Sequence, residues 1–332
     1  MELQLVWGWQ PALYLFLGGM GAGTFIMAAV LYLIDPLKHK RIICASMWAA
    51  PVCVGVGLLL LLLELTNPLR GLMMWQSFSH FTSWMTYGAW GAFAAIVVFG
   101  LSALLATEPV RKALLKGSKG YAKKEQGLRK VLAVIGIALG AFVAVYTGML
   151  LMCADGVPLW NSPFLPCLFT VSAFDTGVAL VELISVICRK KESLAPKAHH
   201  LICLIVVTLV IGECLFLALF LGGALVGDTS TVQGATAASS AHNLVAGDLA
   251  IEFWVLLGVF GLLAPFAVAC AGLVGSKKSE SKKEDAKRDE KTLAMAVGAT
   301  GALIGGCALR FLVLMAGVHA DVITDAVLTT LL

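Results

Sequence analysis

Eight polar side chains interrupt long apolar stretches of this chain, where such groups are rare. They are Tyr14, Glu64, Tyr146, Asp175, Glu182, Glu213, Glu252 and Arg310. An ionisable group within the hydrocarbon of a membrane is costly and is by default a functional candidate. Carboxylates and an arginine in such a medium must pair or shift their pKa values, and groups of this kind gather at functional sites. With two phenols, the set suits proton exchange with an apolar, hydrogen-bonding ligand.

The elements that carry these residues are apolar runs long enough to cross a membrane. The chain is 59% hydrophobic and 13% charged, against about 45–50% and about 25% in soluble domains. A hydrocarbon core of about 30 Å requires about 20 apolar residues per helix. Runs of that length cover 11–33, 42–65, 82–106, 131–153, 167–188, 201–225, 249–274 and 293–317. The sequence therefore predicts an all-α integral membrane protein with eight transmembrane helices in one domain, residues 1–332.

Positive charge is confined to alternate connections between these runs. The connections after the first, third, fifth and seventh runs contain 22 of the 24 Lys and Arg residues, and the others contain only Arg70. Because positively charged loops stay in the cytoplasm, both termini are expected outside it. The charged segment 276–291 is then a cytoplasmic loop, and its composition predicts disorder. Ligand entry and partner docking are expected at the outer face, whose connections are richer in aromatic residues.

The glycine-rich opening stretch, "WGWQPALYLFLGGMGAGTF", is interpreted as the start of a closely packed helix. A secretory signal needs a positively charged first region, but this stretch carries none. A phosphate-binding loop follows a strand, whereas these glycines lie within a helix-length apolar run. Gly19 and Gly23 are four residues apart, a spacing that lets two helix backbones approach each other.

Each polar residue also has a purely structural interpretation. Glu252 can snorkel or cap a helix end, Glu182 can be a structural hydrogen bonder, and Arg310 can simply pair with a carboxylate. A buried tyrosine is often a packing residue with a satisfied hydroxyl. The four residues predicted nearest the outer face are harder to explain in this way, because they come from four different helices. They are Tyr14, Glu64, Tyr146 and Arg310.

Metal and haem chemistry is not expected in this chain. Nine cysteines contain no Cys-x-x-Cys motif, and most lie in apolar runs where Cys is a small buried hydrophobe. The six histidines lie in loops or at run ends, so no pair suits a transmembrane bis-histidine haem. No set for nucleophilic catalysis is evident. An apolar ligand whose carbonyls accept hydrogen bonds from phenols, and which exchanges protons with acidic groups, is a quinone.

An ordered set of motifs resembles the NrfD-like family, of the polysulfide reductase membrane-subunit type. The motifs are "WGWQPALYLFLGGMGAG", "ELTNPLRGLMMW", "TSWMTYGAWG", "YTGMLL", "PLWNSPFLPCLFTVSAFDTGVAL" and "ALRFLVLMAG". The resemblance runs over nearly all eight predicted helices. It implies two four-helix bundles, no haem, and menaquinone or ubiquinone bound near the outer face of a bacterial cytoplasmic membrane. It also implies a four-cluster iron–sulfur partner on that face, connected to a molybdopterin subunit or a multihaem cytochrome.

The resemblance also assigns candidate site residues. Its quinone-contacting positions correspond to Pro11, Tyr14 and Tyr146, although the family pattern has Asn and His at the first two. Tyr14 can still donate a hydrogen bond, whereas Pro11 has no side-chain donor. Glu64 and Arg310 resemble the family's buried residues associated with proton movement.

The sequence therefore favours a quinone-binding, electron-transferring membrane subunit of a respiratory oxidoreductase. Asp175, Glu182 and Glu213 form a weaker hypothesis for a proton path toward the cytoplasm. Two alternatives stay open, namely a secondary transporter with intramembrane carboxylates and a structural anchor whose polar residues only pair. No inverted repeat of the kind found in transporters is evident.

Overall fold

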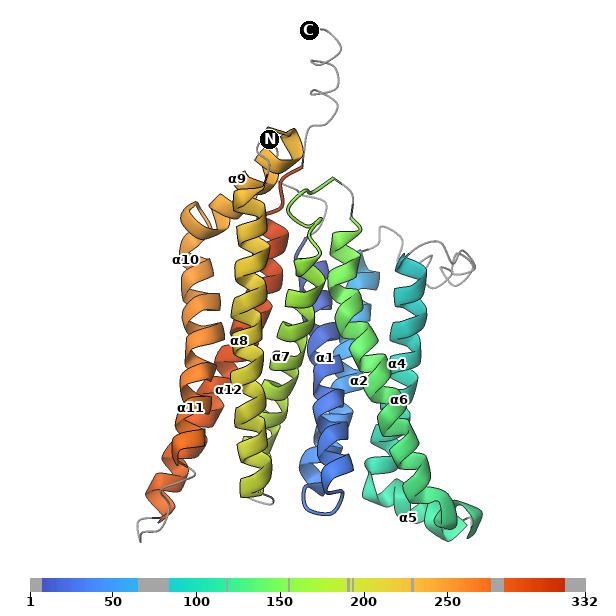
Figure 1. The fold of residues 1–332 in the computed structure, drawn as a ribbon. Coiled ribbons are helices and arrows are strands. Elements are labelled where there is room, and N and C mark those ends of the chain that lie inside the picture. Colours follow the sequence, from blue (N-terminus) through green and yellow to red (C-terminus); the bar gives the residue numbers. More distant parts are fainter. Residues whose placement is uncertain are drawn as a thin grey trace.

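The computed structural model describes residues 8–64, 84–117, 119–154, 156–189, 192, 194–227, 230–275 and 284–319. Within them the chain forms long helices that run side by side (Figure 1). The elements are α1 (Trp9–Ile34), α2 (Lys40–Glu64), α4 (Trp84–Ala106), α5 (Glu108–Gly117), α6 (Lys119–Met152), α7 (Phe164–Cys188), α8 (Pro196–Val226), α9 (Val232–Ala246), α10 (Ala250–Glu252), the π-helix η2 (Phe253–Leu263), α11 (Ala264–Gly275) and α12 (Glu284–Met315).

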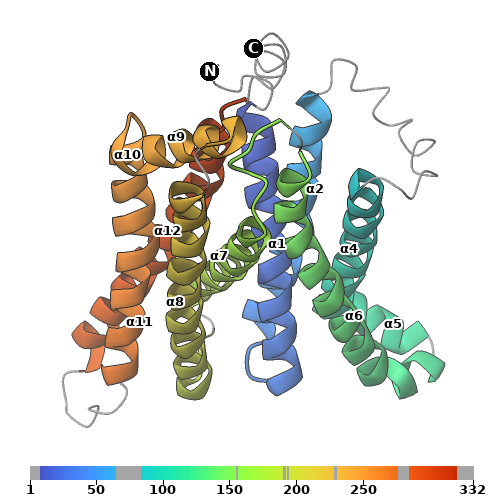
Figure 2. The ribbon, with the colours of Figure 1, turned by 45° about the horizontal axis from the view of Figure 1, so that its top comes forward.

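Eight of the described helical stretches are long and apolar enough to span a membrane, which confirms the predicted number. They are Trp9–Ile34, Lys40–Glu64, Thr86–Ala106, Lys124–Met152, Phe164–Cys188, Pro196–Val226, Ala250–Val274 and Thr292–Met315. Two further helices lie at opposite ends of the bundle, α9 across one end and α5 beside the other (Figures 1 and 2). These ends are called the α9 end and the α5 end below. Helix α1 begins, and α12 ends, at the α9 end (Figure 2).

The centre of the bundle is the crossing of α1 and α7, and its close approach depends on glycine. A Cβ on Gly23 would lie 2.2 Å from the backbone oxygen of Ala173, and one on Gly177 would lie 2.2 Å from the carbonyl carbon of Gly23. A Cβ on Gly19 would lie 3.0 Å from that of Ala173. The prediction that Gly19 and Gly23 serve close helix packing is therefore confirmed.

Around this crossing, α2 and α6 pack against α1, and α4 packs against α2 and α6. Helices α8 and α12 pack against α7, and α11 packs against α8 and α12. Helix α12 meets η2 where Gly305 and Gly261 pack backbone to backbone. The connection before α7 is pinned to α12, because the buried indole Nε1 of Trp160 donates a hydrogen bond of 2.9 Å to the carbonyl oxygen of Val313.

The expectation of a disordered loop at 276–291 is wrong for its second half. Residues 284–291 form the first turns of α12, and 276–283 lie outside the described residues. Acidic and basic residues alternate there at helical spacing, as in Glu284 and Arg288, and such spacing favours a helix despite high polarity.

Helix α9 was not predicted, since its segment is rich in Ser, Thr and Gly. Its start nevertheless follows a known rule: the Thr231 hydroxyl caps the helix by accepting a hydrogen bond of 3.1 Å from the Gly234 N–H.

Candidate functional site

Two buried phenols lie near the α9 end, where α1 and α6 approach each other. Tyr14 lies in the second turn of α1 and Tyr146 six residues before the end of α6, and they are 5% and 6% exposed. Their hydroxyl groups lie close enough to interact electrostatically. Among the described residues, neither hydroxyl has a hydrogen-bonding partner from the protein. Two buried donors near each other therefore lack acceptors in the part of the chain that the structure describes.

Glycines on neighbouring helices provide the space for these rings. The Tyr146 ring lies over Gly88 of α4, where a Cβ would come within 1.7 Å of Cζ. The ring also stacks on Phe142 with a centroid separation of 6.3 Å. Tyr14 lies against Gly57 of α2, where a Cβ would be 3.4 Å from Cδ2. The position of the Tyr146 ring thus depends on a residue without a side chain, whereas a Cβ on Gly57 would only touch Tyr14 at about van der Waals distance.

Pro11 and Glu64, two other predicted site residues, also lie at the α9 end. Pro11 is buried in the first turn of α1, where a missing N–H is tolerated. Glu64 is the last residue of α2, and its half-buried carboxylate lies beside the backbone N–H of Gly8. The segment that follows Glu64, residues 65–83, lies outside the described residues.

Arg310 is completely buried and contacts α7. Its Nη1 donates hydrogen bonds to Ser172 Oγ at 2.5 Å and to the Gly306 carbonyl oxygen at 2.8 Å. Its Nη2 donates one of 3.2 Å to the carbonyl oxygen of Phe169, whose ring centroid lies 5.1 Å from Cζ. Gly19 of α1 lies beside the guanidinium, since a Cβ there would be 3.6 Å from Nη2.

Two buried carboxylates, Asp175 and Glu213, face this arginine. Both interact electrostatically with Arg310, and Ser172 lies between the guanidinium and the Glu213 carboxylate. No described carboxylate lies within ion-pair distance of Arg310. Three buried atoms of this group have no hydrogen-bonding partner in the described part of the chain: Asp175 Oδ1, Glu213 Oε1 and Arg310 Nε. The group therefore contains unused donor and acceptor capacity in a low-dielectric interior.

The structure thus brings Arg310 close to the carboxylates of Asp175 on α7 and Glu213 on α8. The described contacts of Arg310 do not include Glu64. Helix α7 begins at Phe164, earlier than the predicted 167, so Asp175 lies at mid-helix beside Glu213. Glu182 is half-buried, seven residues further along the same face of α7, and interacts with Asp175. The three carboxylates predicted as a proton path therefore lie in one interior region with Arg310.

Sequence reasoning missed Ser172, which joins the arginine to this region. Its spacing was the available signal, because a residue three positions before Asp175 lies on the same helix face. Glu252 is exposed at the end of α10, and its side chain makes no capping hydrogen bond to η2. Within the described ranges, no group of three His, Cys, Asp or Glu residues is arranged to hold a metal ion.

Comparison with known proteins decides the family. The family model described as "Polysulphide reductase, NrfD" matches residues 1–320. The chain belongs to the NrfD family. A component of the polysulfide reductase of Wolinella succinogenes is 30% identical over 320 residues, which cover 94% of this protein and 94% of the relative. Protein NrfD of Escherichia coli is 28% identical over 94% of this protein and 95% of the relative.

A more distant relative is a component of the selenate reductase of Mesobacillus selenatarsenatis. It is 24% identical over 53% of this protein and 46% of the relative. NrfD-family membership and the eight apolar helices together identify a multi-pass membrane protein, and the bacterial inner membrane is consistent with these relatives.

Proposed function

We propose that this NrfD-family protein is the quinone-binding membrane subunit of a respiratory oxidoreductase. It passes electrons between the menaquinone or ubiquinone pool and a partner iron–sulfur subunit. The observation that carries the proposal is the pair of buried phenols, Tyr14 and Tyr146, whose hydroxyls lack protein partners among the described residues. Two relatives are named as components of a polysulfide reductase and of a selenate reductase, which supports a place in a reductase complex.

The donor set fits a quinone. A quinone supplies two-electron, two-proton redox chemistry, and its carbonyl oxygens accept hydrogen bonds. The hydroxyls of Tyr14 and Tyr146 are the donors, and their burial keeps water from competing for those bonds. The backbone at Gly88 sets the position of the Tyr146 ring. Pro11 supplies an apolar contact in place of a hydrogen bond, because it has no side-chain donor.

Proton movement is assigned to the remaining buried groups. Glu64, at the α9 end, exchanges protons beside the quinone site. The positive charge of Arg310 faces the carboxyl groups of Asp175 and Glu213. This charge influences whether each of the two carboxyl groups is protonated. Asp175, Glu213 and Glu182 then continue toward the α5 end, with unpartnered oxygens on the first two that can accept a proton.

The expected position of the iron–sulfur partner follows from the need for a short electron-transfer distance to the quinone. Since the two phenols lie near the α9 end, the iron–sulfur subunit is expected to dock there, and to connect to a molybdopterin subunit or a multihaem cytochrome. The charge pattern of the connections orients the α9 end, with both termini, away from the cytoplasm. The proposal also groups α1, α2, α4 and α6 into one four-helix bundle, and α7, α8, α12 and the helix formed by η2 and α11 into a second.

The experiment compares two tyrosine substitutions in the complex purified from its native membranes. Tyr146→Phe removes one donor and is expected to lower quinol-dependent turnover about tenfold or more. Tyr32→Phe is the matched control, because Tyr32 is also buried but lies near the opposite end of α1. Equal turnover in the Tyr146→Phe variant and the wild type would exclude Tyr146 from the site.

A secondary transporter is the second candidate, because Asp175 and Glu213 lie at mid-helix with unpartnered oxygens. Inhibition of turnover by a quinone analogue separates the two functions, since a transporter has no quinone-dependent step.

A further inference from the structure

A pocket of about 260 Å³ lies at the α5 end, remote from the phenols and from Arg310. It is enclosed by the last turns of α1, the first turns of α2 and α6, and the junction of α4 with α5. Its polar lining consists of Tyr32, Lys40, Arg41, Glu108, Arg111 and Arg129. Nothing in the proposed electron transfer uses these residues.

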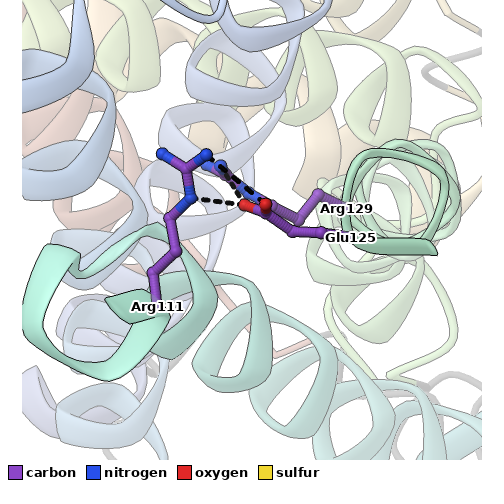
Figure 3. Close-up of polar contacts among 3 residues, drawn as sticks. All are labelled: Arg111, Glu125 and Arg129. Atoms are coloured by element: carbon purple, nitrogen blue, oxygen red, sulfur yellow. Dashed lines mark hydrogen bonds and ion pairs between the residues drawn. The ribbon is translucent and has the colours of Figure 1, made fainter. Parts of the chain in front are cut away.

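Two of the four cations are held in place by a shared carboxylate. Figure 3 shows Arg111 of α5 and Arg129 of α6 converging on Glu125. Arg111 Nε donates to Glu125 Oε1, its Nη2 lies 3.4 Å from Oε2, and Arg129 Nη1 lies 3.6 Å from Oε1. The Arg129 guanidinium also lies over the Tyr32 ring, with Cζ 4.6 Å from the centroid. One carboxylate therefore positions two guanidinium groups.

The other two cations, Lys40 and Arg41, have no ion-pair partner among the described residues. Glu192 accepts hydrogen bonds from the backbone N–H of Arg41, at 3.1 Å from Oε2, which leaves the side chain available. The lining carboxylate of Glu108 is paired with Lys112 at 3.6 Å. Four cations, counted against the carboxylates of Glu108, Glu125 and the adjacent Glu192, still leave the pocket with net positive charge.

We propose that this pocket binds a phosphate-bearing anion, with Lys40, Arg41, Arg111 and Arg129 as its ligands. Arginine forks match phosphate oxygens in geometry as well as charge. Basic pockets between transmembrane helices on the cytoplasmic side bind the head groups of anionic lipids.

The surroundings favour a phospholipid head group over free phosphate as the source. Trp48 lies one turn beyond Cys44 of the pocket wall and is exposed, and its Nε1 donates a hydrogen bond of 2.9 Å to Thr107 Oγ1. Tryptophan gathers at this level of a bilayer. Exposed apolar side chains continue along the same face of α2 at Val52, Val56 and Leu59. A head group in the pocket would place its acyl chains along that face.

The test uses the full-length protein, as purified with its complex, reconstituted in nanodiscs. Three conditions are compared: phosphatidylcholine alone, phosphatidylcholine with phosphatidylglycerol, and phosphatidylcholine with added inorganic phosphate. Native mass spectrometry counts retained phosphatidylglycerol and phosphate, and thermal unfolding reports stabilisation. The double variant Lys40→Gln/Arg41→Gln is expected to weaken phosphatidylglycerol retention about 30-fold.

The matched control, Lys116→Gln/Lys130→Gln, removes two exposed cations from the same end that do not line the pocket. Retention of phosphatidylglycerol that is lost only in Lys40→Gln/Arg41→Gln supports a lipid head group. Stabilisation by inorganic phosphate, lost in the same variant, supports the pocket with free phosphate as its ligand. If the wild type retains neither ligand, the proposal is overturned. An equal loss of retention in the control variant also overturns it, because general surface charge would then be the cause.

Discussion

The ring of Tyr146 occupies the space that a side chain on Gly88 would fill, since a Cβ there would lie 1.7 Å from Cζ. The phenol of α6 is therefore positioned by the backbone of α4. This relationship links a packing feature to the proposed quinone site, because displacement of the ring also displaces the hydroxyl.

Gly88→Ala is accordingly expected to reproduce the effect of Tyr146→Phe, with quinol-dependent turnover at least about tenfold lower. The overlap is with ring atoms, so the ring must move as a whole. The matched control is Gly100→Ala on the same helix, where a Cβ would meet nothing within 4 Å. Wild-type turnover in Gly88→Ala would show that the position of this phenol is irrelevant.

The close crossing of α1 and α7 is predicted to depend on Gly23. Gly23→Ala places a Cβ 2.2 Å from the Ala173 carbonyl oxygen, so the helices must separate. Overpacking of this kind costs about 1–3 kcal/mol of the free energy of unfolding. Gly55→Ala on α2 meets nothing within 4 Å and should instead stabilise by about 0.5–1 kcal/mol. Unfolding in detergent with increasing dodecyl sulfate measures both variants, and equal stabilities would refute the role of Gly23.

Arg310 and its carboxylates are predicted to be energetically coupled. Arg310→Met removes the positive charge that faces Asp175 and Glu213, and is expected to destabilise the protein by about 3 kcal/mol. In an Asp175→Asn/Glu213→Gln background the same substitution should cost less by about 1 kcal/mol or more, because neutral amides need no counter-charge. The same detergent unfolding experiment gives the four free energies. Strict additivity would mean that Arg310 is held only by Ser172 and the backbone carbonyls.

The eight spanning helices were predictable because a run of about 20 apolar residues has few other interpretations. The role of Gly19 and Gly23 was predictable for a similar reason, since their four-residue spacing is itself the packing signal. In these cases the information is local to one helix.

The pairing of Arg310 was not predictable in this way. Which helix faces a given side chain depends on how each helix is rotated within the bundle, and an apolar run carries little of that information. The sequence grouped Arg310 with Tyr14, Glu64 and Tyr146 only by predicted depth, whereas the structure places its guanidinium against Ser172 and near Glu213.

The pocket at the α5 end shows the same limit. Arg111 and Arg129 are separated in sequence and were expected only as members of a positive connection, yet Glu125 brings them together. Helix α9 was missed for another reason, because its polar composition resembles a loop and its cap at Thr231 is a short-range signal.

The most direct test of the proposed function is the affinity of the purified complex for a menaquinone analogue, measured at equilibrium for the wild type, Tyr14→Phe/Tyr146→Phe and Tyr32→Phe. The two hydroxyls are the donors that the proposal assigns to the quinone. The wild type and Tyr32→Phe are expected to bind saturably with the same dissociation constant, and the double variant at least about 30-fold more weakly. Equal affinity in all three proteins would contradict the assignment of Tyr14 and Tyr146 to the quinone site.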